Sequence, residues 1–140
     1  MILYLTKQTF ERFNLTPPEL MRSPVKEITE EVKKREQGNR LLEWGGKLLY
    51  FDRRKCIQFT NFASKFTVFL IDVKVKDLQY LGDGIFQYLI DFYKNNGEMT
   101  ALIERLAKEH PFVVIDRLKD KSIISTLNRT QLTFAEDGYR

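Results

Sequence analysis

The sequence is poor in the side chains on which covalent cross-links and metal centres depend, because its 140 residues include one cysteine and one histidine. Cys56 has no partner for an intramolecular disulfide, which favours a reducing compartment. His110 has no partners at metal-ligand spacing, and we interpret it as a cap at the end of a helix. The P-loop, the dinucleotide-binding glycine pattern and the Gly-x-Ser-x-Gly motif are absent too. The sequence therefore indicates no enzyme class and no cofactor.

Long hydrophobic runs are also missing. No apolar segment approaches the roughly 18–20 residues that span a bilayer. The first residues, Met1 to Leu5, have no basic region before them and end too early for a signal peptide. With 43% hydrophobic and 30% charged residues, the composition is that of a globular protein. We expect one domain over residues 1–140, located in the cytoplasm and without membrane contact.

The charge is mildly basic and unevenly distributed. The chain carries 23 basic and 19 acidic residues, a net charge of +4. Residues 1–70 hold 13 Lys and Arg against 8 Asp and Glu, whereas residues 71–140 hold 10 against 11. A basic half suits a phosphate backbone, although a charge of this size also serves solubility alone.

Apolar periodicity predicts an α+β fold, an antiparallel sheet of about five strands with helices packed on it. Residues 48–51 and 55–60 read as a hairpin with a short polar turn. The run 66–71 is apolar on both faces, which predicts an interior strand. A highly charged segment at about 17–38 has a thin apolar stripe, and we expect an inserted surface helix there. We expect deep burial of these side chains: Phe66, Val68, Leu70, Leu89, Phe92 and Leu106.

The stretch from residue 39 to residue 55 combines the only tryptophan, a Gly-Gly pair and several basic residues. Trp44 beside the two glycines is a candidate platform for stacking a base, and the basic hairpin turn is a candidate phosphate contact. The alternative is that Trp44 anchors the core, the glycines form a turn or bulge, and the charges are solvated. The candidate nucleic-acid-binding residues are Arg40, Trp44, Lys47, Arg53, Arg54 and Lys55.

A second hypothesis concerns three carboxylates. Asp52, Asp72 and Asp116 each lie at the end of a predicted strand, where metal-dependent nucleases place acidic ligands around a divalent ion. The alternative is that each is an ordinary turn residue. If the three converge, the protein is a metal-dependent nuclease or a nucleotide-processing enzyme.

Several segments together resemble a known family. These are residues 1–7, residues 39–61 with Trp44 and the Arg53-Arg54-Lys55-Cys56 stretch, and Thr126-Leu127-Asn128. They are similar to an uncharacterised bacterial family of short proteins, found also in plasmids and phage-like elements and classed as a domain of unknown function. Members usually have a polar residue such as histidine where this chain has Gly45, and they lack most of residues 17–38. The resemblance implies a common fold and no chemistry.

The hypothesis favoured by these observations is a non-enzymatic binding or interaction module whose partner is a nucleic acid or a protein, with the basic hairpin as the candidate nucleic-acid contact. The alternative is the metal-dependent enzyme just described. A third class, a purely structural or partner-binding protein, predicts a large apolar surface patch and oligomers in solution.

Overall fold

The computed structural model describes residues 1–13, 19–21 and 26–136. It contains a sheet and five α-helices, which confirms the α+β class. The strands are β1 (Ile2–Leu5), β2 (Glu19–Met21), β3 (Glu43–Phe51), β4 (Arg54–Asn61), β5 (Thr67–Leu70) and β6 (Val113–Arg117). The helices are α1 (Lys7–Phe13), α2 (Lys26–Glu36), α3 (Leu81–Phe92), α4 (Gly97–Glu109) and α5 (Lys121–Glu136), with short 3-10 turns η1 (Arg40–Leu42) and η2 (Val75–Tyr80).

The sheet is mixed, which corrects the expectation of an antiparallel sheet. Its six strands lie in the order β2-β6-β1-β3-β4-β5. The first strand, β1, is parallel to both of its neighbours, β3 and β6, while the other pairs are antiparallel. The parallel pairing of β1 with β3 is possible because the chain between them is long enough for a crossover. Local sequence patterns do not report such pairings.

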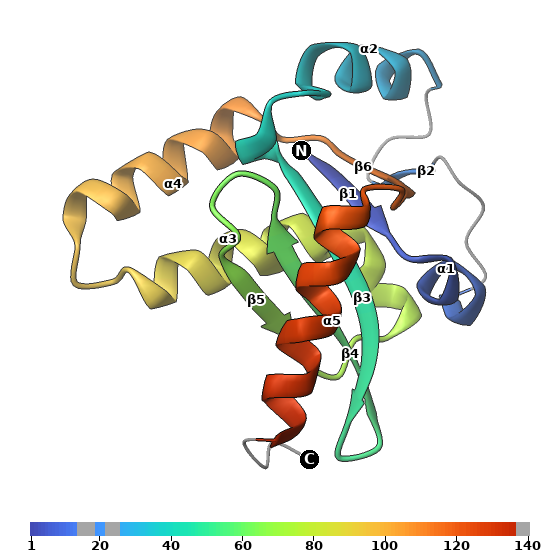
Figure 1. The fold of residues 1–140 in the computed structure, drawn as a ribbon. Helices are drawn as coiled ribbons and strands as arrows, with labels where there is room; N and C mark the ends of the chain where they lie inside the picture. Colours follow the sequence, from blue (N-terminus) through green and yellow to red (C-terminus); the bar gives the residue numbers. More distant parts are fainter. Residues whose placement is uncertain (14–18, 22–25, 137–140) are drawn as a thin grey trace.

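Helices cover both faces of the sheet, with α5 in front of β3 and β4 and α3 behind (Figure 1). Alternate residues of β1 and β3 point to the α3 side and form the larger core, which includes Leu3, Trp44 and Leu48. A smaller core lies under α5 and contains Phe62, Leu118, Ile123 and Leu127. Two separate apolar layers therefore enclose the sheet.

The interior position expected for residues 66–71 is wrong, because β5 forms an edge of the sheet. The run is apolar because it packs under a helix: Phe66 and Leu70 lie against the larger core, which includes α3 residues. Of the side chains expected to be deeply buried, only Val68 is, at 0% exposure. Phe66, Leu70, Leu89 and Leu106 are half-buried.

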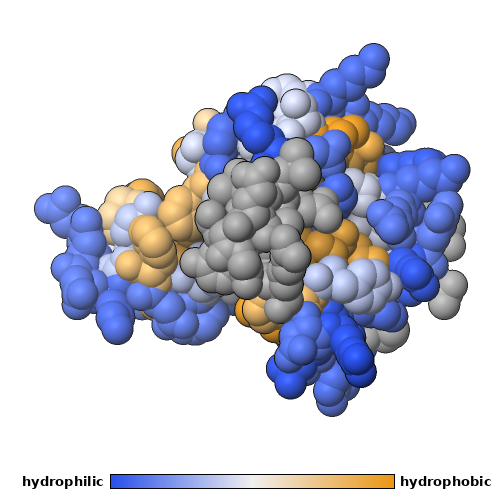
Figure 2. Space-filling model, turned by 60° about the horizontal axis from the view of Figure 1, so that its bottom comes forward, coloured by the Kyte–Doolittle hydropathy of each residue, from blue (hydrophilic) through white to orange (hydrophobic). Residues whose placement is uncertain are grey.

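Phe92 is 60% exposed, which also corrects the burial prediction. It is the last residue of α3, and α3 and α4 together extend past the β5 edge as an arm (Figure 1). Hydrophobic and hydrophilic side chains mix along this arm (Figure 2). When an amphipathic helix extends beyond the edge of its sheet, part of its apolar face is not covered by the sheet.

The helix α2 is anchored through its last two turns. Val32 and Glu36 are each 1% exposed. The Glu36 carboxylate lies 2.6 Å from Nδ1 of His110, the residue that caps the C-terminus of α4, and accepts a hydrogen bond from the Met1 amino group. The remainder of the expected insertion at 17–38 lies partly outside the described residues. None of the described helices is both long enough and apolar enough to cross a bilayer.

Candidate nucleic-acid interface

The β3–β4 hairpin closes with a two-residue turn. Phe51 pairs with Arg54, so Asp52 and Arg53 are the central residues. Their φ angles are +50° and +64°, the left-handed conformation that a type I′ turn requires at both positions. This turn matches the right-handed twist of the strands, but it favours glycine at the second position. Arg53 therefore lies where glycine, which has no Cβ, would be less strained.

The positive charges of Arg53 and Arg54, at this turn, are not neutralised by a neighbouring carboxylate among the described residues. Both side chains are exposed. Among the described residues, neither has a hydrogen-bond or ion-pair partner. Their charges are therefore available to a ligand with phosphate groups.

Two other elements bring further basic side chains to the hairpin. The guanidinium of Arg12, on α1, lies 5.8 Å from the centre of the Tyr50 ring. The Lys55 ammonium lies 5.3 Å from the centre of the Phe13 ring. Tyr50 and Lys55 are directly opposite each other in the hairpin, so these contacts share one face of it. Tyr50 remains 49% exposed.

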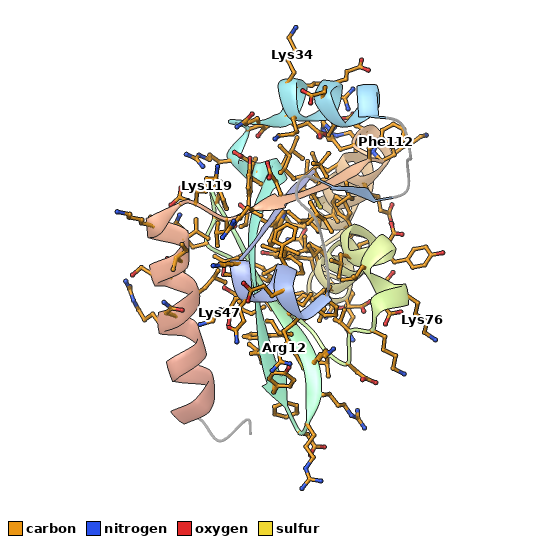
Figure 3. The ribbon with its side chains drawn as sticks, turned by 90° about the vertical axis from the view of Figure 1, so that its right-hand side faces the viewer. Arg12, Lys34, Lys47, Lys76, Phe112 and Lys119 are labelled. Carbon is orange, nitrogen blue, oxygen red and sulfur yellow. The ribbon has the colours of Figure 1, made fainter. Side chains whose placement is uncertain are left out.

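The segment after β5 completes this surface. The Val73 amide donates to the Lys55 carbonyl at 2.7 Å, which places the exposed Lys74 beside the hairpin. We call the surface formed by these residues the basic end: Arg12, Tyr50, Asp52, Arg53, Arg54, Lys55, Asp72 and Lys74. Figure 3 shows Arg12 close to the end of the hairpin, with Lys34 on α2 at the opposite end of the molecule.

The basic end has a clear excess of positive charge. It holds five basic side chains and two carboxylates, a net charge of +3. Two nearby acids are already engaged: Glu11 pairs with Lys7 at 3.9 Å, and the Asp77 carboxylate accepts the Lys74 amide at 2.9 Å. An exposed aromatic ring among unpaired cations is the combination that single-stranded nucleic acid binds.

The structure does not bring all the predicted binding residues together. Trp44 is only 4% exposed and lies in the core on the α3 side, so it offers no open ring face. Lys47 is on the opposite face, where its ammonium donates to Asn128 of α5 at 2.6 Å. Burial lowers the pKa of Lys47. Arg40 lies in η1, near the start of β3, whereas the basic end lies beyond its last residue. These three residues therefore do not belong to the basic end.

Close packing around β3 explains why glycine occupies the two positions after Trp44. Gly45 and Gly46 lie within β3 rather than in a turn or bulge, which corrects that interpretation. A Cβ on Gly45 would meet Ile123 of α5, and one on Gly46 would meet Phe59 and Leu5. Glycine thus allows close packing on both faces of the strand.

The three aspartates do not converge. Asp52 is in the hairpin turn and Asp72 follows β5, but Asp116 pairs with Tyr4, at the level of Gly45 in β3. Since each residue of a strand adds about 3.3 Å, Asp116 lies roughly 20 Å from the turn along the sheet. Its carboxylate binds Lys33 of α2 at 2.8 Å. Among the described residues, no three His, Cys, Asp or Glu side chains are placed to hold a metal ion.

Sequence reasoning missed Arg12, Tyr50 and Lys74. Strand alternation puts Tyr50 on the same face as the buried Trp44, so it predicts burial and not the observed 49% exposure. Arg12 and Lys74 approach the hairpin only through tertiary packing, for which the sequence carries no local signal.

Comparisons with known proteins identify the chain's relatives at the level of a family. The comparison with curated proteins and the comparison with solved structures each found no match. The family described as Domain of unknown function (DUF6933) matches residues 2–137, almost the whole chain. This match confirms the resemblance to a domain of unknown function, and the chain belongs to the DUF6933 family.

Proposed function

We propose that this protein is a binding module that contacts nucleic acid through its basic end. The observation that carries the proposal is the pair Arg53 and Arg54, two exposed guanidinium groups at the hairpin turn with no carboxylate partner among the described residues. Guanidinium groups form paired hydrogen bonds to phosphate oxygens. Arg12 and Lys55 add positive charge on the face of the hairpin that carries Tyr50, and Lys74 lies beside this end of the hairpin. Arg54, paired with Phe51, adds its charge on the other face.

The strain at Arg53 supports this assignment. A left-handed arginine costs about 1 kcal/mol or more relative to glycine. Residues held in costly conformations concentrate at functional sites, so an arginine in this position suggests a role other than stability.

Tyr50 supplies a contact that phosphate binding alone does not require. Its ring is 49% exposed, so a base could contact the part of the ring that Arg12 does not cover, while the surrounding cations hold the backbone. The proposal therefore favours single-stranded over double-stranded nucleic acid. It also places the protein in the cytoplasm, where a free thiol such as Cys56 stays reduced.

The salt dependence of binding tests the proposal. A fluorescently labelled single-stranded oligonucleotide, as DNA and as RNA, would be titrated with protein between about 50 and 200 mM salt. The log of the binding constant should fall linearly with log salt, by about 0.7 for each phosphate contact to a single strand. The double variant Arg53→Ala/Arg54→Ala should reduce this slope by up to about 1.4.

The matched control is Arg105→Ala/Lys108→Ala, which removes two charges from the exposed side of α4, remote from the basic end. It should keep the slope of the unmodified protein. If both double variants lose affinity equally, net charge rather than the basic end determines binding. Absence of binding at low salt contradicts the proposal outright.

A further inference from the structure

A second surface feature lies far from the basic end. It is a cleft of about 480 Å³ between the end of α2, η1, and the loop that joins β6 to α5. Figure 3 shows Lys119, which lines it, near the start of α5 and away from the hairpin end. Its volume is in the range of sites that hold small organic molecules.

The floor of the cleft is a network of buried and half-buried polar groups. The Tyr4 hydroxyl donates to the Glu43 carboxylate at 2.9 Å, and its ring stacks on Phe62 with centroids 5.3 Å apart. Burial and the hydrogen bond to Glu43 raise the pKa of Tyr4. Arg40 lies 3.9 Å from Glu43 and 3.7 Å from Asp120, with its guanidinium over the Phe62 ring.

Every carboxylate oxygen in the cleft already has a partner. The two Glu43 oxygens accept from Tyr4 and from the Gly38 amide. Those of Asp116 accept from Lys33 and from the Arg117 amide. One Asp120 oxygen accepts from the Ile123 amide at the start of α5, and the other faces Arg40. The cleft therefore has few free acceptor oxygens for a cation or for a ligand rich in hydrogen-bond donors.

The unused groups are donors. Among the described residues, the exposed side chains of Arg117 and Lys119 have no partner. Arg40 is 55% exposed and holds its two carboxylates only at the long limit of an ion pair, so several of its N–H groups remain free. With Lys33, four cations line the cleft against three carboxylates.

We propose that this cleft binds a small organic anion, its charged group held by Arg40 and Lys119 and its organic part resting beside Leu118 and Phe62. A phosphate and a carboxylate share the chemistry that these donors recognise. The volume leaves room for more than the anionic group alone. This site is separate from the basic end, so the proposal does not depend on nucleic-acid binding.

Two-dimensional amide NMR tests the site with three probes: inorganic phosphate, ribose 5-phosphate and citrate. The organic anions should shift the amides of Gly38 and of residues 117–120, more strongly than inorganic phosphate does. A preference for ribose 5-phosphate over citrate assigns the ligand as a phosphate, and the reverse preference assigns a carboxylate. Arg40→Gln and Lys119→Ala should each weaken binding about tenfold, the effect of losing one charge-assisted contact.

Lys119→Ala keeps the test decisive if Arg40→Gln disturbs the fold, because Lys119 is exposed and has no partner among the described residues. Lys108→Ala on α4 is the matched control and should bind as the unmodified protein does. Shifts spread over lysines of the whole surface, or unchanged affinity in Lys119→Ala, would overturn the proposal. No shift with any organic anion would do the same.

Discussion

At the scale of single residues, the hairpin turn combines a structural cost with a chemical use. Arg53 has a φ of +64°, which glycine adopts without strain. The turn still forms, because the long β3–β4 ladder fixes the pairing on both sides of it. The proposed contact with nucleic acid gives this arginine a role that a solvated turn residue would not have.

Replacing Arg53 by glycine separates these two effects. Arg53→Gly should raise the free energy of unfolding by a few tenths to about 1 kcal/mol, because relief of the left-handed strain outweighs the greater freedom of glycine in the unfolded chain. The same variant should bind single-stranded nucleic acid more weakly than the unmodified protein. Urea denaturation and oligonucleotide titration measure the two quantities. A variant that is more stable and binds equally well would show that Arg53 is only a solvated turn residue.

At the scale of elements, β3 packs against helices on both of its faces, with large side chains on one face and a glycine on the other. Trp44 and Leu48 fill the core on the α3 side, while Gly45 lets Ile123 of α5 approach the other face. The sequence predicted the hairpin because its alternating strands and its polar turn are local features. It did not predict the role of the glycines, because close approach depends on α5, about 75 residues away in the chain.

The variant Gly45→Ala tests the packing of α5. Its new methyl group would overlap Ile123, which is buried and cannot move aside, so the variant should lose about 1–3 kcal/mol of unfolding free energy. Gly97→Ala is the matched control, since no atom lies near its Cβ position and its φ is not left-handed. That control should be neutral or slightly stabilising. Equal stability of both variants in urea would contradict the close contact between α5 and β3.

At the scale of the whole molecule, the sequence predicted the α+β class but not the arrangement of the sheet. The parallel pairs of β1 and the edge position of β5 follow from long-range contacts. The dependence on long-range contacts also explains why the candidate site was predicted only in part. The sequence placed Arg53 and Arg54 at the end of the hairpin because a turn is local, whereas it grouped Arg40 and Trp44 with them only by proximity in sequence. In the fold, Arg40 lines the cleft and Trp44 joins the core.

Among the described residues, the basic end and the cleft are two of the regions where cations lack an ion-pair partner. They lie at different ends of β3, so a small ligand in the cleft does not contact the basic end. This separation allows their contributions to be measured independently on the intact chain.

Amide NMR of the intact protein with a short single-stranded oligonucleotide shows whether nucleic acid binds at the basic end. We expect shifts confined to residues 51–56, to Arg12 and Phe13, and to residues 73–74, and their loss in Arg53→Ala/Arg54→Ala. Shifts centred on the cleft or on α4, or shifts that persist in the double variant, would contradict the assignment of nucleic-acid binding to the basic end.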